Sequence, residues 1–249
     1  MFTKMLLRSV ATSVAAGSVF AASLVATPAL VATAPEIRTV ACDSYAAEAP
    51  TTTTLTLARA AGQYGAVNRA TATVTDGSAT PTGSVRFTIY DQTTGTVTPG
   101  DTVELTDGQA TLQMSRYLRA NRTYMVTANY LPDDSCEFRP SDADAKFYTV
   151  YKRRTTTDVN APNRRVRQPV KVGVVVSAPF QEGLGGKARV VITRSGKAKV
   201  LRSAVVRLTD RRAVATLTSL RPGLYTAKVR YLGHVNYAAS SGADSFRVR

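Results

Sequence analysis

Apolar and polar residues alternate in short runs through most of the chain after residue 50. In YTAKVRY (225–231) the tyrosines, the alanine and the valine share one face, and the threonine, lysine and arginine share the other. A period of two residues is that of a β-strand with one buried face. ARVVI (188–192) and SFRV (245–248) repeat the pattern, and no amphipathic helix is indicated after residue 50. The sequence therefore predicts an all-β fold.

Glycine-containing pairs divide these runs. They are DG at 76–77 and 107–108, PG at 99–100 and 222–223, and SG at 195–196 and 241–242. Each pair predicts a turn, because glycine adopts backbone angles that other residues avoid. Roughly seven short strands per hundred residues, with regular turns between them, favour a Greek-key β-sandwich.

The chain also repeats itself at a spacing of about one hundred residues, which is the spacing of whole domains. LTDGQATL (105–112) matches LTDRRAVATL (208–217), and Phe138 matches Tyr237 in the loops that follow. We therefore predict two tandem sandwiches. Their boundaries are residues 51–151 for domain 1 and 152–249 for domain 2, joined by the short basic linker YKRRT (151–155).

Each copy contains a leucine, a short turn and then a tyrosine that opens a strand. The second copy has LRPGLY (220–225), and the first has LRANRTY (118–124), which is one residue longer. This order is typical of a tyrosine corner, in which the phenol hydroxyl bonds to backbone a few residues upstream. Tyr124 and Tyr225 are the predicted corner residues.

With these motifs in view, the chain resembles the bacterial Ig-like repeat domains of secreted and cell-surface proteins. PTGSVRF (81–87), LRPGLY and YLGHVNYAAS (231–240) carry the resemblance, although His234 replaces the usual aspartate and Pro132 of the first copy replaces a glycine. The family implies spacers, stalks and adhesive or glycan-binding modules, and rarely catalysts. Similarity of fold does not by itself assign a function.

The N-terminus has the layout of a secretory signal peptide. Lys4 and Arg8 precede an uncharged, Ala- and Ser-rich run, and small residues follow it. We place the signal peptide at residues 1–29, with Ala34 as an alternative cleavage position, and an N-terminal segment at residues 30–50. An uncleaved membrane anchor and lipidation of Cys42 are weaker alternatives. The expected mature protein is exported, extracellular or associated with the cell envelope, and has no membrane span.

The chain has two cysteines, Cys42 and Cys136. An isolated pair in an oxidising compartment usually forms a disulfide, so we predict a structural Cys42–Cys136 bond.

Charge distinguishes the two copies. Residues 30–150 contain 9 Lys and Arg against 13 Asp and Glu, whereas residues 151–249 contain 21 against 4. Alternation places several of these cations on the outer face of one predicted sheet, where arginine favours phosphate or carboxylate partners. The candidate anion-binding residues are Arg189, Lys228, Arg230, Arg247 and Arg249. Lys and Arg on exposed strands also keep edges soluble, which is the alternative interpretation.

Catalytic and metal-binding signals are weak. His234 is the only histidine and has no GxSxG or HExxH motif around it, so we predict that it is a loop residue. The acidic loop around Cys136 (131–145) matches no calcium motif, and we predict no metal and no cofactor. Nucleic acid is disfavoured because no outward aromatic residues interleave with the cations.

We therefore expect a secreted, non-catalytic Ig-like binding or adhesion module. Its basic sheet would contact an anionic cell-wall polymer or an acidic protein surface. A purely structural spacer is the alternative, and an enzyme is a distant third.

Overall fold

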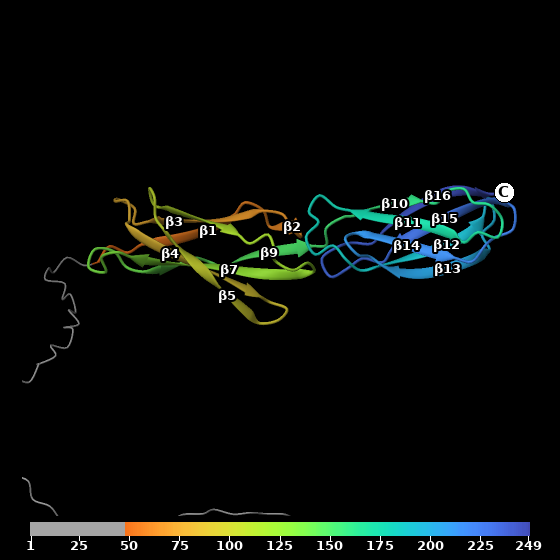
Figure 1. The fold of residues 1–249 in the computed structure, drawn as a ribbon. Coiled ribbons are helices and arrows are strands. Elements are labelled where there is room, and N and C mark those ends of the chain that lie inside the picture. Colours follow the sequence, from red (N-terminus) through yellow and green to blue (C-terminus); the bar gives the residue numbers. More distant parts are fainter. Residues whose placement is uncertain (1–47) are drawn as a thin grey trace, which may run out of the picture. The chain divides into compact units, whose positions relative to one another are not determined.

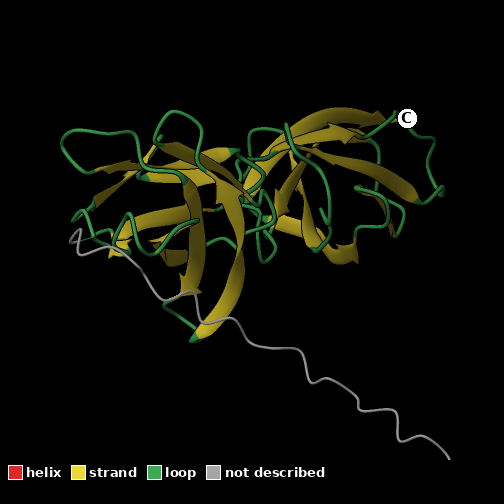
Figure 2. Ribbon diagram, turned by 90° about the vertical axis from the view of Figure 1, so that its left-hand side faces the viewer, coloured by secondary structure: helices red, strands yellow, loops and turns green. Residues whose placement is uncertain are grey.

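The computed structural model describes residues 48–249, which lie in one compact unit, Ser44–Arg249. The predicted signal peptide and Cys42 lie outside the described residues. Within residues 48–249 the chain contains strands, turns and loops but no helix (Figure 2). The prediction of an all-β sandwich fold is confirmed.

The first half of the described chain contains nine strands, most of them labelled in Figure 1. They are β1 (Thr52–Leu57), β2 (Ala61–Gln63), β3 (Asn68–Thr75), β4 (Gly83–Asp91), β5 (Thr96–Glu104), β6 (Gln109–Met114), β7 (Arg122–Pro132), β8 (Ser141–Asp142) and β9 (Lys146–Tyr151). The second half contains β10 (Thr156–Asn160), β11 (Val170–Ser177), β12 (Lys187–Arg194), β13 (Val200–Arg207), β14 (Arg212–Leu217), β15 (Gly223–Tyr231) and β16 (Ser240–Val248).

Both halves arrange their strands in the same order. The first has a sheet β1-β3-β6 and a sheet β2-β9-β7-β4-β5, and the second has β10-β11-β14 and β13-β12-β15-β16. We call these halves the first and second sandwich. A parallel bridge between Arg164 and Val248 stands in the second sandwich where β2 pairs with β9 in the first.

Alternating side chains build the core of each sandwich. Along β11 the four valines Val170, Val172, Val174 and Val176 are at most 1% exposed, and the residues between them face outward or are half-buried. Burying one valine contributes about 1.5–3 kcal/mol, so the inner faces of the two sheets supply the main favourable energy.

The segment that enters each sandwich is fixed in the same way. Ala49 forms a parallel bridge to Phe138, and Arg153 forms one to Tyr237. The hydroxyl of Thr53 is within 2.7 Å of the Ser141 hydroxyl. The corresponding distance between Thr157 and Ser240 is 2.6 Å. These matched contacts show that the two entry segments are structurally equivalent.

Two of the predicted turns are wrong. Pro99 and Gly100 lie within β5. This strand is at the edge of its sheet, where proline is tolerated, and its pairing with β4 shifts register between Arg86 and Thr88. Ser241 and Gly242 lie within β16. A β-carbon on Gly242 would come within 2.1 Å of the Thr157 carbonyl oxygen. This glycine therefore permits a close approach between strands rather than a turn.

Candidate functional site

The predicted anion-binding residues come from three neighbouring strands of one sheet. Arg189 lies on β12, Lys228 and Arg230 lie on β15, and Arg247 lies on β16. All four side chains are exposed, while their strand neighbours Ala188, Val190, Val229, Tyr231 and Val248 are buried. We call these four residues the basic face. Arg249 follows β16, and its backbone N–H donates to the Arg164 carbonyl.

Like charges stand directly opposite each other on this sheet. Arg189 and Arg230 are cross-strand partners, and Lys228 is the partner of Val191 on the same pair of strands. Together with Ser241, Gly242 and Ala243 of β16 they line a shallow depression of about 620 Å³. Like charges at paired positions destabilise a sheet, so sheet stability does not explain this arrangement.

The equivalent surface of the first sandwich is nearly neutral. There the strand pair corresponding to Arg189 and Arg230 is Arg86 and Asn129. The Asn129 amide donates to Asp142 Oδ1 at 2.6 Å, whereas Arg230 has the uncharged Ser241 beside it. The same fold therefore forms this surface without a cluster of cations.

Ion pairs are confined to the first sandwich and its entry segment. Among residues 48–249 the only ion pairs join Arg122 to Asp91 and Arg139 to Glu48. No cation of the second sandwich is paired with a carboxylate in this part of the chain. The charge of the basic face is consequently uncompensated within the described protein.

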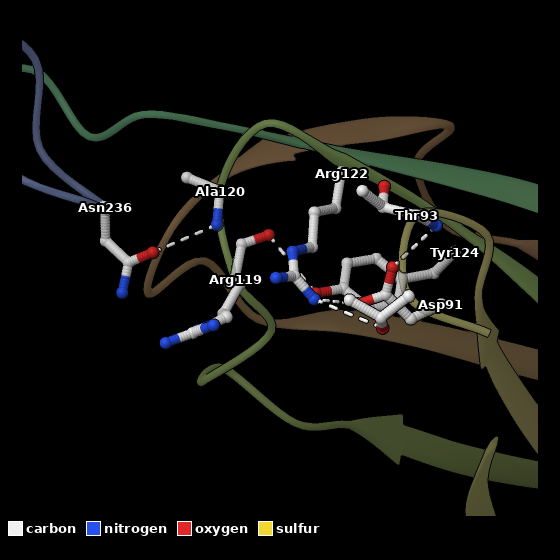
Figure 3. A network of polar contacts seen from close by, with 8 residues as sticks. Asp91, Thr93, Arg119, Ala120, Arg122, Tyr124 and Asn236 are labelled. Atoms are coloured by element: carbon white, nitrogen blue, oxygen red, sulfur yellow. Dashed lines mark hydrogen bonds and ion pairs between the residues drawn. The ribbon is translucent and has the colours of Figure 1, made fainter. Parts of the chain in front are cut away.

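The tyrosines predicted for the corners bond to backbone. Tyr225 Oη donates to the Arg221 carbonyl at 2.7 Å, four residues upstream. Tyr124 Oη donates to the Arg119 carbonyl at 3.2 Å, five residues upstream, in line with the longer loop of the first copy (Figure 3). Both tyrosines are buried.

An ion pair lies beside Tyr124. Figure 3 shows the Arg122 guanidinium directed at the Asp91 carboxylate, which also accepts the Thr93 N–H at 2.9 Å. Burial opposes the charged carboxylate, but the hydrogen bonds from Arg122 and Thr93 keep the pKa of Asp91 below its ordinary value. This pair belongs to the first sandwich and is not part of the basic face.

Neither His234 nor the acidic loop lines the depression of the basic face. The exposed His234 exchanges backbone hydrogen bonds with Tyr237 at 3.0 and 3.3 Å, which closes a surface turn. No group of three His, Cys, Asp or Glu residues in the described part of the chain could hold a metal ion. Cys136 lies in the loop between β7 and β8, where its backbone N–H donates to Asp134 Oδ1. Since Cys42 is outside the described residues, the disulfide stays a prediction.

Sequence reasoning missed a set of aromatic contacts between the two sandwiches. The Tyr64 ring meets Phe180 edge-on at 5.4 Å and Tyr237 at 5.6 Å between ring centroids. Arg153 of the linker donates from Nε to the Tyr64 carbonyl at 2.7 Å. Asn236 Oδ1 accepts the Ala120 N–H at 3.1 Å (Figure 3). These residues lie in separate loops, and neither QYG (63–65) nor APF (178–180) carries a pattern that predicts the contact.

No helix in residues 48–249 has the length and apolar character needed to cross a membrane.

A search of curated protein sequences finds no match. Three solved structures are similar over 78–79% of this chain, at 10–12% sequence identity. They are a DUF4785 family protein from Legionella pneumophila (TM-score 0.36, 12% identity, 55% of that chain covered), red sea bream transglutaminase (0.37, 10%, 31%) and the FN1–FN3 domains of chicken CNTN1 (0.31, 12%, 65%).

This chain spans less than two thirds of each of those three proteins, and TM-scores this low carry no conclusion about function. The family comparison is more specific. Residues 55–151, which make up nearly all of the first sandwich, match the bacterial Ig-like domain (group 3). The first sandwich is therefore a bacterial Ig-like domain, in agreement with its all-β sandwich fold.

Proposed function

We propose that this protein is an exported, non-catalytic Ig-like module that binds an anionic polymer of the cell envelope through its basic face. The observation that carries the proposal is the direct pairing of Arg189 with Arg230 across β12 and β15. A multivalent anion between two adjacent guanidinium groups forms charge-assisted hydrogen bonds with both and relieves their mutual repulsion. The first sandwich, which has Arg86 and Asn129 at these positions, serves as the internal reference.

The chemistry of the face fits repeated phosphate or carboxylate groups. Guanidinium groups bind both kinds of group through two parallel N–H···O bonds. Val191, Gly242 and Ala243 give the depression between the cations an apolar floor, against which the uncharged part of a polymer can lie. An acidic protein surface would use the same contacts, and a spacer would use none.

The test compares retention of the full chain on isolated cell walls and on a phosphate polymer resin. The variant Lys228→Thr, Arg230→Asn installs the residues that the first sandwich carries at these positions. We expect it to lose at least about tenfold in affinity, because two charge-assisted contacts disappear. Binding by the unchanged chain should also fall strongly in roughly 0.5 M salt.

The matched control removes two charges from the opposite sheet. Lys171 on β11 and Arg212 on β14 are exposed, and Lys171→Thr, Arg212→Asn changes the net charge by the same amount. Equal losses for both variants would show that binding follows net charge and would overturn the proposal. Absence of saturable binding to either matrix would instead favour the spacer.

A further inference from the structure

A second basic site lies at one end of the second sandwich, apart from the basic face. It is a cavity of about 600 Å³ between the loop before β11, the facing ends of β12 and β13, and the loop between β14 and β15. Four arginines line it, and we call it the arginine pocket: Arg167, Arg194, Arg202 and Arg221. None of the four belongs to the basic face.

The pocket is positively charged and uncompensated. Its other lining residues are Val166, Leu201, Ser219, Leu220, Pro222 and Tyr225, so no carboxylate faces the arginines. Arg202 donates to Thr218 Oγ1 at 2.5 Å and to the Leu201 carbonyl at 2.8 Å. The side chains of Arg167, Arg194 and Arg221 form no hydrogen bond or ion pair with any residue in the described range 48–249. Three guanidinium groups therefore retain all their donors for a ligand.

The first sandwich uses the equivalent end in a different way. The Tyr64 N–H donates to the Tyr151 carbonyl, just as the Val166 N–H donates to the Arg249 carbonyl. The next residue in each copy, Gly65 or Arg167, has a positive φ of 79° or 67°. In the first sandwich this position holds the ring of Phe180, since a β-carbon on Gly65 would lie 2.3 Å from that ring.

The second sandwich lacks this aromatic contact surface. Val166 stands where the first copy has Tyr64, and Arg167 stands where it has Gly65. A side chain at the glycine position blocks the approach that Phe180 makes, so the same packing of another Ig-like domain does not fit here. Arg167 thus has a side chain on left-handed backbone where the first copy has a glycine. What remains at this end is a concave, cationic surface.

We propose that the arginine pocket binds a phosphate monoester. Such a group carries a charge of about −1.5 to −2 at pH 7 and three strong acceptor oxygens, which suits several converging guanidinium forks better than a single carboxylate does. Val166, Leu220 and Pro222 provide an apolar wall for the organic part of the ester. The ester is either a free small molecule or the terminal group of a polymer, since both present the same head group.

Isothermal titration calorimetry of the purified full chain tests this with phenyl phosphate, benzoate and benzyl alcohol, which share an aromatic ring and differ in the head group. We expect saturable binding of phenyl phosphate, weaker binding of benzoate and none of benzyl alcohol. Arg194→Gln and Arg221→Gln should each weaken phenyl phosphate binding about tenfold or more. Arg194→Lys should have an intermediate effect, because it keeps the charge but loses the fork.

The control Lys228→Thr, Arg230→Asn alters the basic face and should leave phenyl phosphate binding unchanged, so this site and the basic face fail or succeed separately. All four substituted positions are exposed, and unchanged unfolding midpoints verify that the variants are folded. Displacement of phenyl phosphate by poly(ethylene glycol) that ends in a phosphate monoester, but not by the same polymer without phosphate, would identify a polymer end as the source, and no displacement would identify a small ester. Benzoate binding as tight as phenyl phosphate, or insensitivity to Arg194→Gln and Arg221→Gln, would overturn the proposal.

Discussion

The ring of Phe180 lies against the backbone of Gly65, so closely that a β-carbon on the glycine would come within 2.3 Å of the ring. Gly65 belongs to the first sandwich and Phe180 to the second. The edge-on contact of Phe180 with Tyr64 and the bond from Arg153 to the Tyr64 carbonyl surround this point. The linker therefore takes part in a packed junction.

Phe180→Ala should loosen this junction. It removes the ring contacts with Tyr64 and Tyr117, and aromatic pairs contribute about 0.5–1.5 kcal/mol each beyond their buried area. We expect faster tryptic cleavage at the linker residues 152–154, because the peptide bonds there become accessible to the protease when the junction opens.

The control is Tyr117→Phe, which keeps the ring beside Phe180 and removes only the exposed hydrogen bond to Glu182. Its cleavage rate should match that of the unchanged chain. A Phe180→Ala protein that resists trypsin as well as the unchanged chain would show that the junction does not protect the linker.

The two tyrosine corners should differ in strength. Tyr225→Phe breaks a bond of 2.7 Å to the Arg221 carbonyl, and Tyr124→Phe breaks one of 3.2 Å to the Arg119 carbonyl. A buried hydrogen bond contributes about 0.5–1.5 kcal/mol, and a shorter bond lies nearer the upper end. Denaturant unfolding should therefore show a larger loss of free energy for Tyr225→Phe; equal losses would contradict this order.

The fold should lose stability at alkaline pH. Burial raises the pKa of Tyr231 and the pKa of Tyr237 to about 12, from 10.0. Between these values the unfolded chain releases protons that the folded chain keeps, so the free energy of unfolding falls as pH rises. The contribution is fully present below pH 10 and is lost as pH approaches about 12.

Circular dichroism and tyrosinate absorbance, followed together from neutral to alkaline pH, measure this effect. Tyr237→Phe should reduce the alkaline loss of stability, whereas Tyr151→Phe, at an exposed position, should leave it unchanged. Unfolding that is complete well below pH 10 would assign the transition to other groups.

Gly242→Ala should be strongly destabilising. The added methyl would meet the Thr157 carbonyl oxygen at 2.1 Å, where backbone has to move. Forced displacement of packed backbone costs about 1–3 kcal/mol or more. Gly185→Ala is the control, because a β-carbon there meets nothing within 4 Å and its φ is not positive, so its melting temperature should match that of the unchanged chain. A Gly242→Ala protein with an unchanged melting temperature would contradict the close packing of β10 on β16.

The sequence predicted the features that depend on local pattern. Alternation in YTAKVRY placed Tyr225, Ala227, Val229 and Tyr231 inward, and each is at most 4% exposed. The same alternation directed Lys228 and Arg230 outward. Periodicity of two determines facing in a strand wherever one side is buried, which explains this success.

Features that depend on loops from distant parts of the chain could not be predicted. Phe180 meets Gly65 across more than a hundred residues, and no local pattern marks either residue as a contact. The glycine in SG at 241–242 predicted a turn because glycine serves both turns and close strand packing. The arginine pocket joins four segments whose order in space is known only once the sheets are assembled.

The Gly65–Phe180 contact also gives the pair of copies a direction. One partner must offer a bare backbone and the other a ring, and the second copy has Arg167 in place of the bare backbone. Exchanging the order of the two sandwiches, or following the second with a duplicate of itself, would therefore not rebuild the junction. The two halves share a fold but are not interchangeable, because a chain with their order reversed would lack the Gly65–Phe180 contact.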